Sequence, residues 1–187
     1  MILPKDGEIL HYPQFFNATE CEIYFQSLKT QINWKHEPIK LFGKEIMQPR
    51  LTAWYGDTKY TYSGITMNPK PWTEHLQEIK KKIEQTAKVT FTSALLNQYR
   101  DEHDSVGWHR DNEKELGKFP VIGSVSFGAT RVFKLKHRLE KNLKASVELT
   151  DGSFLLMRGE TQHYWQHCIP KLTIPTGPRI NLTFRIL

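Results

Sequence analysis

The chain has 187 residues, of which 39% are hydrophobic and 25% are charged, and its formal net charge is +6. This length suits one compact domain and leaves little room for two, and the composition is that of an ordinary soluble globular protein. No apolar run approaches the ~20 residues that a membrane span needs, and the first residues lack the apolar stretch of a signal peptide. Two cysteines provide no disulfide framework. We therefore expect one intracellular domain, cytoplasmic or, in a eukaryote, nuclear, that has no membrane contact and whose charge suits an anionic partner such as nucleic acid.

Two helices are expected in the first half of the chain. Thr19-Glu20-Cys21-Glu22 has the form of a capping box, and apolar residues at helical spacing follow it, which predicts a helix over about 19–32. A second helix is expected to start near Pro71, with Trp72, Leu76, Ile79 and Ile83 along one stripe. Between them, glycines, prolines and aromatic residues over 33–70 predict short strands and hairpins.

After Lys88 the pattern changes to a period of two, which is typical of strands. Many short strands after two helices predict an α+β, mainly β fold: a jelly roll supported by two N-terminal helices, in a single domain. Strands are predicted at 91–100, 121–127, 130–136, 153–157, 163–169 and 179–187.

A group of candidate metal ligands lies in the second half of the chain. His109 and Asp111 belong to a polar loop over 101–112, and two ligands spaced by two residues on an extended segment point the same way. A third ligand must come from a distant strand, and both His163 and His167 are candidates there. Two histidines and one carboxylate can occupy one face of an octahedral iron(II) and leave the other positions open.

The last strand alternates between polar and apolar side chains. Ile180, Leu182, Phe184 and Ile186 face one way, while a polar row faces the other. A polar strand face exposed to water would show the same alternation, but two arginines inside a barrel need anionic partners. A dicarboxylate would provide one carboxylate for each planar guanidinium, with Asn97 and Tyr99 adding hydrogen bonds from their own strand. The polar row consists of Arg179, Asn181, Thr183 and Arg185.

These segments together resemble the AlkB family of iron(II)/2-oxoglutarate dioxygenases, and they are most similar to its branch that repairs alkylated double-stranded DNA. The resemblance runs from about residue 36 to 187. It rests on Pro49-Arg50, Tyr55-Gly56-Asp57, Tyr60-Thr61-Tyr62-Ser63-Gly64, Pro69-Lys70-Pro71-Trp72, Asn97-x-Tyr99, His109-Arg110-Asp111-Asn112-Glu113, Ser124-Val125-Ser126-Phe127-Gly128, His167 and Arg179-x-Asn181-Leu182-Thr183-Phe184-Arg185.

The resemblance implies a double-stranded β-helix core over about 90–187 and a nucleotide-recognition lid over about 36–70. It also implies that Fe(II), 2-oxoglutarate and O2 are used to demethylate bases such as 1-methyladenine and 3-methylcytosine, with release of succinate, CO2 and formaldehyde. It places iron on His109, Asp111 and His167, which decides against His163. It places 2-oxoglutarate on Asn97, Tyr99, Arg179, Asn181, Thr183 and Arg185, with Arg179 at the distal carboxylate and Arg185 near iron.

The substrate side follows from the same resemblance, because an enzyme that acts on a base in DNA must take it out of the stack. Phe42 would be the tip of an intercalating finger, and Tyr60 and Tyr62 would form walls of the base pocket. Asn112 and Glu113 would contact the polar edge of the base, although the related branch often has Asp where Asn112 stands and Phe where Tyr62 stands. The remaining expected substrate contacts are Gly43, Lys44 and Arg50, with basic residues Arg131, Lys134, Lys136, Arg138, Lys141 and Lys144 expected to contact phosphates of the opposite strand.

Other functions fit parts of this pattern. The same chemistry could act on RNA, single-stranded DNA or protein, although a finger at Phe42 has little use on a single strand. A nucleic-acid-binding module without catalysis would not need the three ligands and both arginines. A zinc hydrolase would leave Arg179 and Arg185 without a role. We therefore predict a DNA oxidative demethylase that acts as a monomer, with a preference for duplex DNA.

Overall fold

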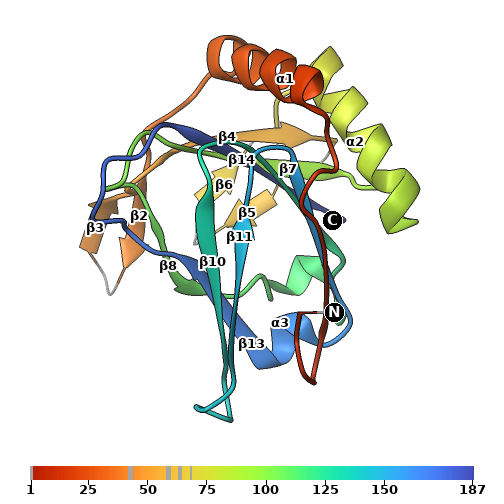
Figure 1. Ribbon diagram of the computed structural model, residues 1–187, viewed down its shortest axis with the longest axis vertical. Coiled ribbons are helices and arrows are strands. Elements are labelled where there is room, and N and C mark those ends of the chain that lie inside the picture. The colour runs from red at the N-terminus through yellow and green to blue at the C-terminus, as the bar shows by residue number, and fades with distance from the viewer. Residues whose placement is uncertain (1, 42–43, 58–59, 63–64, 68) are drawn as a thin grey trace.

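Two antiparallel sheets face each other in a computed structural model that describes residues 2–41, 44–57, 60–62, 65–67 and 69–187, without the side chains of 40, 41, 44, 60–62 and 65–67 (Figure 1). The larger sheet has the strand order β1-β12-β9-β14-β7-β4, and the smaller has the order β11-β10-β13-β8. The two facing sheets form the predicted jelly roll. The larger sheet consists of β1 (Glu8–Tyr12), β4 (Leu51–Gly56), β7 (Ser93–Tyr99), β9 (Ile122–Gly128), β12 (Ser153–Arg158) and β14 (Arg179–Arg185). The smaller consists of β8 (Val106–His109), β10 (Arg131–His137), β11 (Lys144–Leu149) and β13 (Trp165–Ile169).

Two long helices cover the outer face of the larger sheet (Figure 1). Helix α1 spans Ala18–Gln31 and begins at Asn17, whose side chain accepts a hydrogen bond from the Glu20 backbone N–H. The capping box therefore joins Asn17 and Glu20, and the prediction of Thr19 and Glu22 was wrong, because Asn17 has the extended backbone that an N-cap needs. Helix α2 spans Glu74–Ala87 with Thr73 as N-cap, three residues after the predicted start.

Most of the buried apolar side chains form two cores that the larger sheet separates, and a third, small cluster consists of Trp54 and Leu95. The apolar residues of β14, Ile180, Leu182 and Phe184, point to the helices and pack in the first core with Leu28 and Ile79. The second core lies between the sheets. It contains Tyr99, Ile122 and Leu155 from the larger sheet and Phe133, Leu135, Leu149, Trp165 and Ile169 from the smaller. The polar row of β14 consequently faces the second layer, inside the barrel.

Several elements differ from the sequence predictions. Residues 161–164 form a short helix, α3 (Thr161–Tyr164), so the predicted strand at 163–169 begins only at Trp165. The predicted polar loop over 101–112 contains β8, and the strands β1 and β11 were not predicted. In the expected lid region, β2 (Pro38–Leu41) pairs with β3 (Lys44–Met47) and β5 (Tyr60–Tyr62) with β6 (Ile65–Met67). Within the described part of the chain, no helix has the length and apolar character needed to cross a membrane.

Candidate active site

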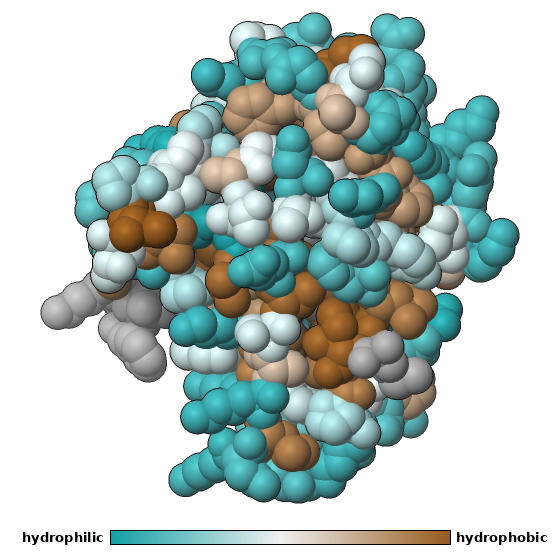
Figure 2. Space-filling model, in the orientation of Figure 1, coloured by the Kyte–Doolittle hydropathy of each residue, from teal (hydrophilic) through white to brown (hydrophobic). Residues whose placement is uncertain are grey.

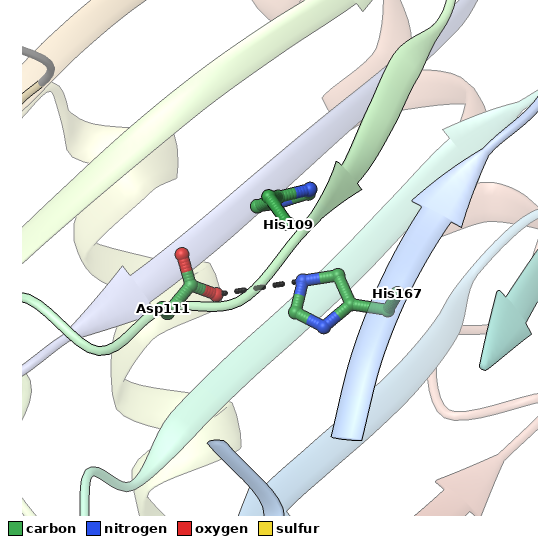
Figure 3. A group of neighbouring side chains, drawn as sticks. All are labelled: His109, Asp111 and His167. Atoms are coloured by element: carbon green, nitrogen blue, oxygen red, sulfur yellow. Dashed lines mark ion pairs between the residues drawn. The ribbon is translucent and has the colours of Figure 1, made fainter. Parts of the chain in front are cut away.

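The pairing of β8 with β13 brings the three predicted metal ligands together. His109 and His167 lie directly opposite each other in the register of these strands, and their ring centroids are 4.3 Å apart. Asp111 follows two residues after His109, and its Oδ2 is 3.7 Å from His167 Nε2 (Figure 3). One potential ligand atom from each residue lies within 4.8 Å of the others. His163 lies in α3 instead, where it contacts the Lys118 carbonyl oxygen and Phe119, away from this group.

The protonation states of these ligands suit a divalent cation. Burial alone would raise the pKa of Asp111, but the positive charge of Arg185 and the neighbouring histidines lower it to about 2. Burial lowers the pKa of His167 to about 3, so the ring stays neutral at physiological pH. His109 Nδ1 lies 2.8 Å from the Gly107 carbonyl oxygen, which only accepts, so Nδ1 carries the proton and Nε2 is left as a ligand. The donor set therefore fits iron(II), with two imidazoles and one carboxylate.

Arg185 fixes the orientation of the carboxylate. Its Nη2 donates to Asp111 Oδ1 at 2.6 Å, and both side chains are buried. The Asp111 backbone N–H donates to Gln162 Oε1 at 3.0 Å. Asp111 is thus held from two sides, and its second oxygen, Oδ2, is directed toward His167.

A buried cavity of about 50 Å³ adjoins the three ligands. Arg179 lines it at only 1% exposure, and it donates to Ser126 Oγ at 2.9 Å. Its Nε and Nη1 have no hydrogen-bond acceptor within the described part of the chain, which is unusual for a buried guanidinium. A carboxylate would satisfy this cation, so the cavity fits the distal end of 2-oxoglutarate. The other polar residues that line the cavity are Arg50, Asn97, Tyr99, Ser124, Asn181, Thr183 and Arg185.

The polar residues of the cavity hold one another. Asn181 Nδ2 donates to Ser124 Oγ at 2.9 Å and to the Val125 carbonyl oxygen at 2.8 Å, and Thr183 Oγ1 donates to Asn181 Oδ1 at 3.1 Å. Arg50 Nε donates to Asn97 Oδ1 at 2.8 Å. Asn181 therefore supports the cavity wall, and Arg50, expected to contact substrate, is buried and positions Asn97. A direct contact between Arg50 and substrate stays a prediction.

Three supporting residues were not expected from the sequence. Ser124 and Ser126 point to the same face of β9, where they accept hydrogen bonds from Asn181 and Arg179 of β14. The alternation of small polar residues on β9 could have predicted this role. Gln162 gave no signal, because its bond to Asp111 depends on α3.

The predicted substrate contacts are only partly described. Phe42 and Gly43 lie outside the described residues, as do the side chains of Lys44, Tyr60 and Tyr62. Asn112 is exposed. Glu113, two residues after Asp111, is half-buried, and its Oε2 is buried without a hydrogen-bond partner within the described part.

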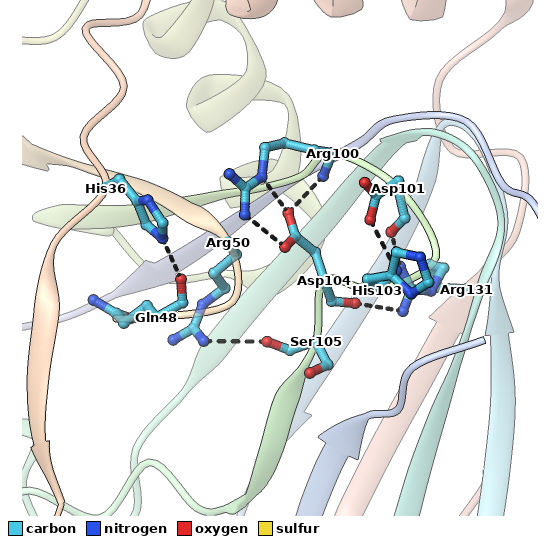
Figure 4. Close-up of polar contacts among 9 residues, drawn as sticks. All are labelled: His36, Gln48, Arg50, Arg100, Asp101, His103, Asp104, Ser105 and Arg131. Atoms are coloured by element: carbon cyan, nitrogen blue, oxygen red, sulfur yellow. Dashed lines mark hydrogen bonds and ion pairs between the residues drawn. The ribbon is translucent and has the colours of Figure 1, made fainter. Parts of the chain in front are cut away.

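The predicted basic grip on phosphates was partly wrong. Arg131 is 1% exposed and donates to the carbonyl oxygen of Asp104 at 2.8 Å (Figure 4). It also donates to the carbonyl oxygen of Pro170 at 2.6 Å, so it has no access to a phosphate. Lys134, Arg138, Lys141 and Lys144 are exposed. Hydrophilic side chains dominate the lower end of the molecule, where the hairpin between β10 and β11 lies (Figure 2).

Known proteins are similar to this chain in sequence and in fold. The model of the 2OG-Fe(II) oxygenase superfamily matches residues 8–185. Alpha-ketoglutarate-dependent dioxygenase alkB homolog 3 of Mus musculus is 44% identical over 183 residues, which are 93% of this chain and 64% of that protein. DNA oxidative demethylase ALKBH2 of Homo sapiens is 36% identical over 192 residues, which are 96% of this chain and 74% of that protein. The solved structure of OsALKBH1 has a TM-score of 0.64 at 18% identity, over 95% of this chain and 97% of that one.

The chain therefore belongs to the 2OG-Fe(II) oxygenase superfamily, within its AlkB family. This confirms the resemblance and the cofactors that it implied, Fe(II), 2-oxoglutarate and O2. The chain spans slightly less than two thirds of the length of the alkB homolog 3 relatives.

Proposed function

We propose that this protein removes N-linked methyl groups from bases in DNA, of the 1-methyladenine and 3-methylcytosine type. The single observation that carries the proposal is the group of His109, Asp111 and His167 that lines one cavity with Arg179, within a chain of the AlkB family. DNA is chosen because one set of relatives is named DNA oxidative demethylase. When bound, iron(II) with 2-oxoglutarate and O2 supplies the oxidation of the methyl group, after which succinate, CO2 and formaldehyde are released.

The residues of the chain hold the reacting groups in place. Asp111 stays ionised and His167 stays neutral, so both are ready to bind a cation without losing a proton first. Arg179 binds the distal carboxylate of 2-oxoglutarate in a cavity that the apolar side chains of Phe133 and Ile169 also line. Because Arg179 is buried, a charge-assisted contact there is stronger than the same contact in water.

Glu113 is the better candidate for recognising a methylated base. Methylation of N1 of adenine or N3 of cytosine makes the base cationic, and a carboxylate nearby favours that form. Asp111 is already committed to Arg185, whereas Glu113 Oε2 has no partner within the described part of the chain. We infer that Glu113 contacts the charged base edge and that Asn112 and the Tyr60 and Tyr62 walls assist it.

The test uses matched single-stranded and duplex oligonucleotides that carry one N1-methyladenine. The purified protein is incubated with iron(II), ascorbate and 2-oxoglutarate, and mass spectrometry follows the loss of one CH2 unit. We expect loss that requires 2-oxoglutarate, is abolished in His109→Ala and persists in His103→Ala, whose side chain is 76% exposed on the preceding loop. Formation of succinate without demethylation would support oxygenase activity but would refute N1-methyladenine in DNA as the substrate. No succinate would favour the nucleic-acid-binding module.

The duplex preference rests on Phe42 alone, and Phe42→Ala tests it. A finger that fills the gap of a flipped base is needed only in a duplex. We expect the variant to lose duplex repair while single-strand repair stays within about twofold. Equal losses on both substrates would instead favour single-stranded DNA or RNA as the natural target. We also propose that the chain works as a monomer inside the cell.

A further inference from the structure

A second groove lies on the outer face of the smaller sheet. It has a volume of about 630 Å³ and is lined by Trp108 of β8, Lys134, Leu135 and Lys136 of β10 and Lys144, Ala145 and Ser146 of β11. The metal ligands His109 and His167 line the cavity inside the barrel, so this groove is on the opposite side of the same strands. It is therefore separate from the active site.

The groove is positively charged. Lys134 and Lys136 alternate on β10, and Lys144 lies opposite Lys136 in the register with β11. None of the three forms an ion pair within the described part of the chain. Glu148 is the nearby acid on β11, and it lies at the other end, opposite Val132. Unpaired cations on one face raise the local potential and attract a polyanion.

The strand register places the two lysines of β10 in the middle of the smaller sheet. Lys134 lies opposite Cys168 of β13, and Lys136 lies opposite Gln166. Because β10 lies between β11 and β13, both lysines belong to the central part of the sheet face rather than to its edge.

An exposed tryptophan sits beside these lysines. Trp108 is 43% exposed, and Lys136 Nζ lies 4.3 Å from the centre of its ring. The exposed part of this ring offers a flat surface against which a partner can stack. Cations that follow a phosphate backbone, together with an aromatic ring on which a base stacks, are the combination found in single-strand-binding grooves. Duplex DNA presents no free base face to such a ring.

We propose that this groove binds single-stranded nucleic acid as a second site, with Lys134, Lys136 and Lys144 at phosphates and Trp108 against a base. The choice of DNA rests on the proposed function, because the chemistry of the groove fits DNA and RNA single strands alike. A strand engaged here would hold the protein on its substrate while a base elsewhere on that strand enters the active site. The effect is a higher local concentration of target bases.

The first test measures the binding of a labelled oligothymidine of about 20 nucleotides by fluorescence anisotropy over a range of salt concentrations. The variant is Lys134→Gln/Lys136→Gln/Lys144→Gln, and the control is Lys29→Gln/Lys81→Gln/Lys88→Gln, three exposed lysines on or beside the helices. We expect about tenfold weaker binding and a salt slope reduced by about 2, from ~0.7 per phosphate contact. Affinity unchanged relative to the control overturns the proposal. Lys134→Gln and Lys144→Gln, each exposed, repeat the test singly if the triple variant does not fold.

Trp108→Ala separates a nucleic-acid site from a general polyanion surface. We expect oligothymidine and oligouridine to bind at least fivefold more weakly, in line with the loss of one stacked base, while heparin binding is unchanged. Because Trp108 precedes His109, the variant is accepted only if Mn²⁺ still raises its melting temperature. Equal affinity of wild type and variant for both oligonucleotides overturns the role of the ring.

Demethylation distinguishes this inference from the proposed function. On a trinucleotide carrying N1-methyladenine, the lysine variant should match wild type, while KM for a long strand rises about tenfold. If wild type demethylates neither substrate but the lysine variant still loses strand binding, the proposed function fails and the groove stands. If wild type is active and the variant has unchanged KM on the long strand, the groove proposal fails.

Discussion

Replacing Arg131 by methionine should destabilise the fold and weaken co-substrate binding together. Arg131 is 1% exposed and donates to three backbone carbonyl oxygens. Two of them belong to Asp104, at 2.8 Å, and Asp101, at 3.3 Å (Figure 4). The third belongs to Pro170, at 2.6 Å. It joins the loop before β8 to the residue after β13. These two strands carry His109 and His167. No carboxylate side chain forms an ion pair with it within the described part of the chain.

The expected loss follows from the carbonyl groups. Each buried acceptor left without a donor costs about 1–3 kcal/mol, and the two short bonds contribute most. Methionine fills part of the volume and removes the cost of burying a charge, whose effect is seen in the lowered pKa of Arg131. We therefore expect a net loss of about 3 kcal/mol in the free energy of unfolding. Arg158→Met, which breaks a surface pair with Glu8, should cost less than about 1 kcal/mol.

Arg131 also acts on the co-substrate cavity through charge. The Cζ atoms of Arg131 and Arg179 lie 5.5 Å and 5.0 Å from the centre of the Tyr99 ring. Burial lowers the pKa of Arg179, and Arg131 lowers it further because the two cations repel. A dicarboxylate relieves this repulsion, so its affinity should fall severalfold in Arg131→Met.

Urea unfolding measures the stability, provided that the denaturant dependence of the free energy is the same in variant and wild type. Calorimetry with Mn²⁺ in place of iron measures the binding of 2-oxoglutarate. A stability loss below about 1 kcal/mol would show that the three carbonyl groups find water or other donors, and would refute the reasoning. Unchanged affinity for 2-oxoglutarate in a folded variant would show that Arg131 acts only on the fold.

Three further predictions concern the site itself. First, the metal-free protein should lose stability in mild acid. The pKa of His167 is about 3 in the folded state, below its unfolded value, so the unfolded state binds more protons below about pH 6.5. The free energy of unfolding should therefore fall by about 2 kcal/mol by pH 5. Asp111, with a pKa of about 2, adds a loss only below about pH 4, and urea unfolding of His167→Gln should show a flatter pH dependence than wild type. Second, Mn²⁺ at about 100 times its Kd should stabilise wild type by about 3 kcal/mol and leave Asp111→Asn unchanged in thermal melts; an equal rise in both would place the ion elsewhere. Third, Arg179→Lys should weaken 2-oxoglutarate binding about tenfold in calorimetry, because lysine lacks the planar fork, while the Mn²⁺ stabilisation persists; unchanged affinity would show that the carboxylate binds elsewhere.

The polar row of β14 could be predicted because it follows from local chain geometry. In a strand, successive side chains point to opposite faces, so Arg179, Thr183 and Arg185 had to share one side once Ile180 and Leu182 faced the core. The fold class followed from the same alternation in the other strands. Periodicity alone did not decide between His163 and His167, because residues 161–164 form a turn of helix.

The buried position of Arg131 could not be predicted from the sequence. Arginine is seldom fully buried, and local pattern places it with the exposed lysines of the same hairpin. Its three acceptors come from residues 101, 104 and 170, which meet only after β8 and β13 have paired. The strand β8 was missed for a related reason: a short polar segment with exposed Gly107 and Trp108 resembles a loop until its partner strand is known.

The pairing of β8 with β13 determines the active site and the outer groove at once. His167 of β13 and His109 of β8 line the inner cavity, whereas Trp108 of β8 lines the outer groove. A shift of one residue would exchange the two faces, removing a metal ligand and burying the tryptophan. The pairing has an irregularity between His167 and Ile169, so the register on the two sides of it differs. Insertions near Gly107 should therefore abolish metal binding and strand binding together, whereas charge changes at Lys134 or Lys144 alter the groove alone.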